Sequence, residues 1–292
     1  DNPKSDYALR GKVLGDLSVD VQTSVITGAS VGTGGSTFAP VIYTGNGGTQ
    51  IITAGLSPDL VWIKRRDQIT SHMLYDTVRG SGASKPLVSN ATYAEGSVTD
   101  IDAASYGYLS AYTSDGFTVE AGTTNGVYTN GDGFDYVAWC WNAGDTTVTN
   151  NEGSVEAQVR SNGTFSICTF PAPDGVGGDA TFGHGLNTAP AMVITKSQIN
   201  GAWYVYHQYL GADSARFYII LNDPGPSADA SAGGAWVSAP TNTLFTYGTN
   251  FSSGAGTPVV AYCWAESPRQ NFGSYTASGN NAVTVDCGFE PA

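Results

Sequence analysis

Charged residues are scarce in this chain, and basic residues are the scarcest. Only 13% of its 292 residues are Asp, Glu, Lys or Arg, against about 25% in an average protein. The 12 basic residues face 25 acidic ones, a formal net charge of −13. Affinity for nucleic acid depends largely on Lys and Arg, so we expect no nucleic-acid partner. No apolar run approaches the ~20 residues of a membrane-spanning helix, so we expect no membrane partner either.

Cysteine is also rare, and its spacing is wrong for a thiolate zinc site. The four residues Cys140, Cys168, Cys263 and Cys287 contain no C-x-x-C pair. Cys140 lies in the apolar run 136–141 (YVAWCW) and is expected to act as a small buried hydrophobic residue. Three disulfide connectivities remain open.

The residue patterns of catalysis are missing. The three histidines His72, His184 and His207 do not occupy matching positions, and no G-x-S-x-G, H-E-x-x-H or phosphate-binding motif occurs. Most carboxylates stand beside Gly, Ser or Thr, which is typical of turns rather than of a glycosidase pair. The densest set of oxygen ligands, residues 130–135 (NGDGFD), lacks the Glu that completes a calcium loop. We therefore expect no enzymatic activity, no catalytic residue, no metal site and no cofactor.

Glycine and aromatic residues are abundant instead. The chain has 38 Gly, 16 Tyr, 11 Phe and 6 Trp, and so many aromatic residues argue against disorder. Runs of four to six residues rich in Val, Ile, Thr, Tyr and Trp alternate with Gly, Asn, Asp or Pro, which is typical of short strands. No amphipathic helix is evident. The pattern predicts an all-β protein built from antiparallel sandwich or jelly-roll domains.

The chain also repeats itself with a period of roughly 100–130 residues, too long for a solenoid. Five segments recur in the same order. The pairs are 58–64 with 190–196, 72–76 with 203–207, 87–90 with 219–222, 117–119 with 245–247, and 137–141 with 260–264. Runs such as 60–63 (LVWI) are apolar at consecutive positions, which predicts central strands with both faces covered.

The repeats divide the chain into two tandem β-sandwich domains. We expect an extended N-terminal arm at 1–38, a first sandwich at 39–144, a polar linker at 145–164 and a second sandwich at 165–292. Residues 275–291 resemble residues 43–58, and the last 25 residues, 268–292, are expected to form a hairpin. This hairpin either begins a third repeat or completes the second.

Aromatic residues outside the strongest strand patterns are candidates for ligand binding. Tyr106, Tyr108 and Tyr112 lie in a polar stretch, and Trp236 follows two glycines in a loop. Amphipathic rings of this kind suit recognition surfaces such as carbohydrate platforms. The remaining tryptophans near these repeats are assigned to the core; these are Trp62, Trp139, Trp141 and Trp264.

Several motifs together resemble the tandem β-rich virion proteins of tailed phages, notably marine cyanophages. They are YTGNG at 43–47, GLSPDLVWIK at 55–64, HMLYD at 72–76, DGFT at 115–118, VAWCW at 137–141 and FGSYT at 272–276. The second repeat departs from the pattern, with FPAP at 170–173 in place of YTGN and His207 in place of Asp. The arm at 1–38 has no counterpart.

This resemblance implies a non-enzymatic structural role in a virion, of the tail-fibre type, with a lectin-like sandwich fold. The partners would be other copies of the chain and other virion proteins. An alternative is a carbohydrate-binding adhesin that attaches to a host surface glycan. The N-terminal arm contains eight apolar residues between Leu9 and Ile26, so we expect it to help build an oligomer by covering a neighbouring surface.

Overall fold

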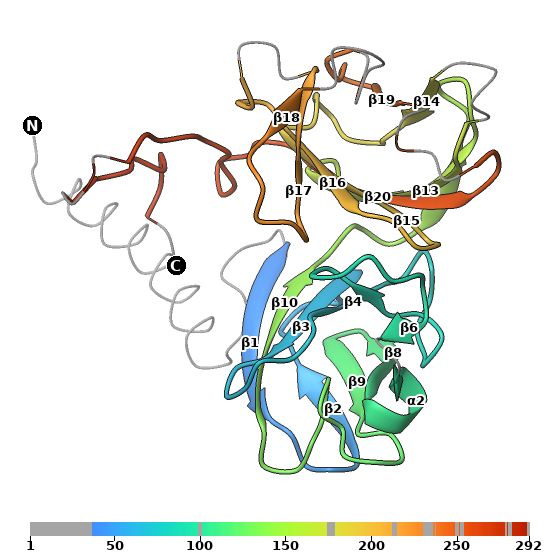
Figure 1. Cartoon of the computed structure of the whole chain (residues 1–292), viewed down its shortest axis with the longest axis vertical. Helices are drawn as coiled ribbons and strands as arrows, with labels where there is room; N and C mark the ends of the chain where they lie inside the picture. Colours follow the sequence, from blue (N-terminus) through green and yellow to red (C-terminus); the bar gives the residue numbers. More distant parts are fainter. Residues whose placement is uncertain are drawn as a thin grey trace, which may run out of the picture.

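The computed structural model describes residues 37–98, 101–173, 179–211, 215–229, 236, 238–248, 251, 254–277, 279 and 282–290. These residues form an all-β protein with several antiparallel sheets (Figure 1). One helix of four residues, α2 (Ala103–Tyr106), is capped by Asp102, whose carboxylate accepts a hydrogen bond from the Ser105 N–H. No helix in the described part of the chain has the length and apolar character needed to cross a membrane.

The first unit contains a five-stranded sheet in the order β1-β10-β3-β4-β5 and a three-stranded sheet in the order β2-β9-β8. A further short pair joins β6 to β7. The strands are β1 (Phe38–Thr44), β2 (Thr49–Thr53), β3 (Leu60–Arg65), β4 (Met73–Asp76), β5 (Leu87–Val88), β6 (Ser97–Val98), β7 (Ile101–Asp102), β8 (Tyr108–Thr113), β9 (Gly116–Glu120) and β10 (Asp135–Trp141).

The second unit contains an eight-stranded sheet in the order β11-β12-β13-β20-β15-β16-β17-β18 and a pair of strands, β14 and β19. The strands are β11 (Thr147–Asn150), β12 (Ala157–Ser161), β13 (Phe165–Pro171), β14 (Ala180–Gly183), β15 (Met192–Ser197), β16 (Trp203–His207), β17 (Phe217–Ile220), β18 (Ala228–Asp229), β19 (Leu244–Tyr247) and β20 (Pro258–Trp264).

The repeated segments occupy equivalent strands. β3 lies between β10 and β4, and β15 lies between β20 and β16 in the same way. A side-chain contact repeats as well. The Asn90 side-chain oxygen accepts a hydrogen bond from the His72 N–H at 2.8 Å, and Asn222 accepts one from the Trp203 N–H at 2.9 Å. Each asparagine thus holds the start of the preceding strand.

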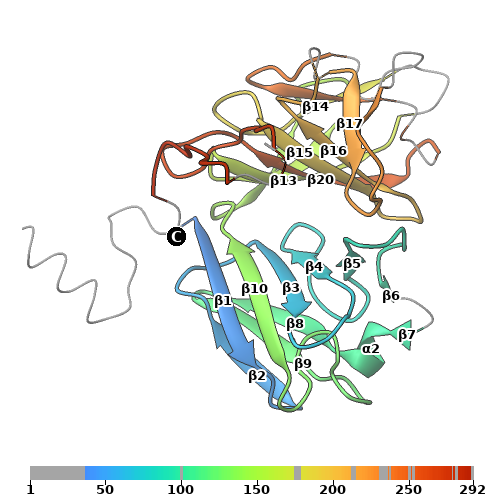
Figure 2. The ribbon, with the colours of Figure 1, turned by 60° about the vertical axis from the view of Figure 1, so that its left-hand side comes forward.

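Three apolar clusters separate four layers of sheet. One lies between the two sheets of the first unit, and another lies between the large sheet of the second unit and the β14–β19 pair. The third lies between the two large sheets and includes Leu60, Leu74, Phe165, Ile194 and Trp264. Figure 2 shows β13, β15 and β20 on the side of the second unit that faces the first. Strand β15 is therefore covered on both faces, as its apolar residues predict, whereas β3 is covered on both faces at Leu60 and only partly at Trp62.

Buried polar contacts also join the units. The Asp76 carboxylate accepts hydrogen bonds from Arg79 Nε at 2.6 Å and from the Tyr262 hydroxyl at 2.8 Å, and none of these side chains is more than a few per cent exposed. The indole N–H of Trp203 donates to the Val88 carbonyl at 2.8 Å. Arg160 pairs with the buried Asp59 at 2.6 Å.

Three segments were predicted from the sequence at the ends of the two units. The predicted linker at 145–164 is wrong in its main part, because β11 and β12 form a hairpin that extends the second sheet beside β13. The described residues of the predicted hairpin at 268–292 contain no strand, and the single isolated bridge near them joins Ser267 to Gln270. The predicted N-terminal arm, up to residue 36, lies outside the described residues.

Candidate functional site

The outer face of the first large sheet is only half covered. Successive cross-strand rows on this face pair Phe38 with Trp141, Pro40 with Trp139 and Ile42 with Val137, and Trp62 lies beside Trp139. The second unit covers the end of the face that carries Leu60, Leu74 and Trp141. The other end remains accessible, and Ile42 is 69% exposed there. We call this accessible part the open face; its residues are Phe38, Pro40, Ile42, Trp62, Val137 and Trp139.

The equivalent positions in the second unit are buried. The strand registers match Phe38 to Phe165, Pro40 to Ile167 and Val137 to Val260. Phe38 is 39% exposed, whereas Phe165, Ile167 and Val260 are at most 1% exposed. The difference arises because the β4–β5 region of the first unit packs on the second sheet, whereas Pro40 and Ile42 on β1 stay exposed. The open face is therefore the accessible copy of a surface that this fold buries in the second unit.

A groove of about 510 Å³, which we call the aromatic groove, continues from the open face into the junction between the units. Its walls come from both large sheets and from the segment that follows β20. Its lining residues are Thr37, Phe38, Trp62, Trp141, Thr164, Met192, Ile194, Trp264, Ser267, Arg269, Gln270, Asn271, Phe272 and Phe289. The rings of Trp141 and Trp264 meet there edge to face, with centroids 6.0 Å apart.

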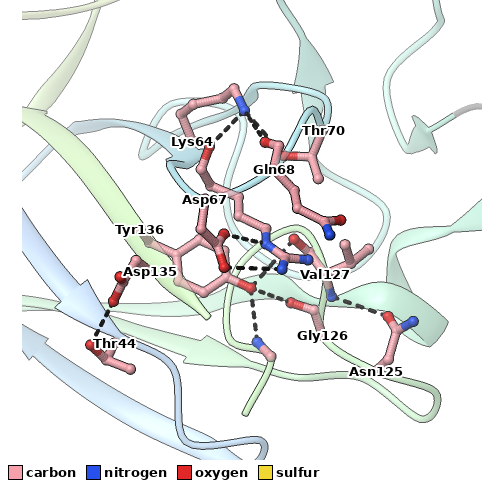
Figure 3. Close-up of polar contacts among 12 residues, drawn as sticks. Thr44, Lys64, Asp67, Gln68, Thr70, Asn125, Gly126, Val127, Asp135 and Tyr136 are labelled. Carbon is pink, nitrogen blue, oxygen red and sulfur yellow. Dashed lines mark hydrogen bonds and ion pairs between the residues drawn. The ribbon is translucent and has the colours of Figure 1, made fainter. Parts of the chain in front are cut away.

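A second hollow, of about 720 Å³, lies at the turn between β3 and β4. Figure 3 shows the Lys64 ammonium at this turn, where it donates to the carbonyl of Gln68 and to the hydroxyl of Thr70. Partial burial and the nearby Arg65 lower the pKa of Lys64. Arg65 donates to both carboxylate oxygens of Asp67 and stacks 3.4 Å above the Phe134 ring. Lys64 and Arg65 therefore stabilise the turn itself, and the exposed Arg66 is the other cation that lines the hollow.

The structure does not bring the four predicted ligand-binding residues together. Tyr106, Tyr108 and Tyr112 are half-buried and pack against the core of the first unit. Trp236 belongs to the other unit, where it is fully buried and donates its indole N–H to the Phe217 carbonyl at 3.0 Å. As a surface platform, Trp236 is ruled out, because its ring is part of the apolar core of the second unit.

The histidines act as structural acceptors. Trp62 donates its indole N–H to His72 Nδ1 at 3.1 Å, and the Leu186 N–H donates to His184 Nδ1 at 3.1 Å. The Tyr209 N–H donates to His207 Nδ1 at 3.2 Å. Burial lowers the pKa of all three imidazoles. Lower pKa values favour the neutral imidazole, and each ring accepts its hydrogen bond from an indole or backbone N–H rather than from a nucleophilic side chain.

The cysteines and the oxygen-rich loop at 130–135 also have structural rather than catalytic surroundings. All four cysteines are free thiols, and burial raises the pKa of Cys140 to about 12, which suits the small hydrophobic residue predicted from sequence. The Asn130 amide at the start of the 130–135 loop donates to Asn46 Oδ1 at 2.9 Å and to the Gly48 carbonyl at 2.7 Å. In the part of the chain that the structure describes, no three His, Cys, Asp or Glu side chains are grouped to hold a metal.

Sequence reasoning missed the open face and the groove because it assigned their tryptophans to the core. The strand prediction itself is confirmed, since β10 buries alternate residues and β20 buries all but the first. The alignment of the two repeats does show that Trp139 is equivalent to Tyr262. It does not show which of the two equivalent sheet faces is covered by another part of the protein, because that depends on tertiary contacts.

The fold and these surfaces define an all-β repeat protein with two related units packed through their large sheets. The chain belongs to the family described as Domain of unknown function (DUF7483), whose model matches residues 33–292. No curated protein matches it significantly, and no solved structure does.

Proposed function

We propose that this protein is a non-enzymatic structural component of a phage virion, of the tail-fibre type, that assembles from copies of itself. The half-covered sheet carries this proposal. In the second unit, the same face is buried by a neighbouring unit of the same kind. In the first unit, Trp139, Pro40 and Ile42 stay accessible, and a contiguous apolar face of this sort marks an interaction surface. The occupant we propose for the open face is a second copy of the chain.

The symmetry of the assembly depends on which surface of the second copy meets the open face. A two-fold contact gives a dimer, and a head-to-tail contact gives a ring or a filament. The virion setting rests on the motif resemblance. The finer fold, two tandem jelly-roll or lectin-like sandwiches, belongs to the same proposal; the matching strand orders around β3 and β15 support it.

Sedimentation velocity on the full chain tests self-association. We expect a species larger than the 30.3 kDa monomer. Ile42→Asp puts a charge on the open face and is expected to weaken association at least about tenfold, and Trp139→Ser should act in the same direction. Ile69→Asp is the matched control, because Ile69 is fully exposed on the β3–β4 turn outside the face.

Circular dichroism of each variant checks that the fold is retained. A wild-type chain that remains monomeric at high concentration would contradict the proposal. The proposal would also be contradicted if the folded Ile42→Asp variant associated as strongly as the wild type, or if Ile69→Asp weakened association as much as Ile42→Asp does.

A further inference from the structure

The aromatic groove has donors that the protein does not use. Three of the six tryptophans donate their indole N–H within the chain, namely Trp62, Trp203 and Trp236. Among the described residues, Trp139, Trp141 and Trp264 donate to no acceptor within the chain, and Trp141 and Trp264 line the groove. Neither of these two indole nitrogens is among the buried atoms that lack a partner, so both N–H groups are accessible and free to donate to a ligand.

The groove also has fixed acceptors. The Gln270 side-chain amide donates to the Ala265 carbonyl at 2.6 Å, and the Asn271 amide donates to the Cys287 carbonyl at 3.1 Å. These bonds use the NH₂ groups and leave Gln270 Oε1 and Asn271 Oδ1 as acceptors. Groups that combine donor and acceptor capacity, such as hydroxyls, match this set.

The charge of the groove further limits the chemical class of the ligand. Arg269 is the charged side chain among the described lining residues, and its guanidinium makes no ion pair or hydrogen bond in the described part of the chain. The chain as a whole has 25 acidic and 12 basic residues. In a chain with this excess of acidic residues, an unpaired arginine is a local positive charge that attracts a carboxylate. A guanidinium group binds a carboxylate through two parallel hydrogen bonds.

We propose that the aromatic groove binds an acidic sugar, a pyranose that carries a carboxylate. The apolar face of the ring packs on the indole and phenyl rings of the walls, and the hydroxyls bond with the free indole N–H groups and amide oxygens. Arg269 binds the carboxylate. The groove shares Phe38 and Trp62 with the open face. Arg269 lies outside the open face, so a variant at Arg269 tests the sugar site separately from assembly.

Tryptophan fluorescence and saturation-transfer NMR with trigalacturonate test the site, with neutral maltotriose as the uncharged comparison. We expect the full chain to bind trigalacturonate with a Kd on the order of 1 mM or tighter. Arg269→Gln should weaken trigalacturonate binding about tenfold and leave maltotriose binding unchanged. Arg216→Gln is the matched control, since Arg216 is an exposed arginine outside the groove.

Trp141→Ala should abolish binding of both sugars. Because this change removes part of the inter-unit core, the surface variant Arg269→Gln provides the deciding result. Absence of trigalacturonate binding, equal binding by Arg269→Gln, or equal loss in Arg216→Gln would overturn the inference. Sedimentation of Arg269→Gln separates this outcome from a failure of self-association, which should be unaffected.

Discussion

Lys64 and Lys196 occupy the same place in the two repeats but have different surroundings. Each ammonium donates to the carbonyl of the next residue, Arg65 or Ser197, and to a carbonyl of the following turn. Lys196 is fully buried. Burial, together with the positive charge of Arg79, lowers its pKa to about 8. Packing of one unit on the other has thus turned a partly exposed lysine into a buried one.

The low pKa of Lys196 predicts a pH dependence of stability. Between a folded pKa of about 8 and an unfolded value near 10.4, the unfolded chain binds more protons than the folded chain. Its unfolding free energy therefore rises with pH in this window. From pH 7 to 9.5 the wild type should gain about 2 kcal/mol relative to Lys196→Met.

Urea unfolding of both proteins at several pH values measures this difference. Lys64→Met is the comparison, and its difference from the wild type should change less, because Lys64 is only half-buried. A constant difference between wild type and Lys196→Met would contradict the assignment.

At the scale of elements, the segment from β4 to β5 connects the two units through one buried ion pair. Arg79 contacts Asp76 on its own segment and the Tyr262 hydroxyl on β20. Burying two charges is tolerated here because further donors and acceptors complete the pair, including the Lys85 carbonyl that accepts from Arg79 at 2.9 Å.

Arg79→Met leaves Asp76 as an uncompensated buried charge and should destabilise the protein by roughly 3–5 kcal/mol. Arg216→Met breaks an exposed pair with Asp229 and should cost roughly 0–1 kcal/mol. Denaturant midpoints for the two variants, at equal slope, provide the comparison. Similar losses would show that the buried pair is not special.

At the scale of the whole molecule, the two units share a core and should unfold together. Trp203 is fully buried in the second unit, and its indole N–H donates to the carbonyls of Val88 and Ala91 in the first. Trp203→Ala removes this ring and should cost roughly 3–5 kcal/mol. Fluorescence and circular dichroism should still report one coincident transition. Two separate transitions, with only one displaced, would contradict the shared core.

The sequence predicted the parts of the fold that depend on local pattern. Its repeats and apolar runs indicated antiparallel strands, and the runs around Trp62 and Trp264 indicated strands with two covered faces. It did not predict that 145–164 would add β11 and β12 to the second sheet, because polar residues suit an edge strand as well as a linker. It also placed Trp236 at the surface, since glycine-rich neighbours resemble an exposed loop.

The sequence by itself determined which residues form strands and which side chains share a face, because alternation along a strand is a property of neighbouring residues. Only the tertiary structure decided which faces are covered. Phe38 and Phe165 stand at equivalent positions, and one is 39% exposed while the other is 1% exposed. That difference depends on contacts between segments more than 100 residues apart, such as Arg79 with Tyr262. No local pattern encodes such contacts, so the open face and the aromatic groove emerged only when the units were packed together.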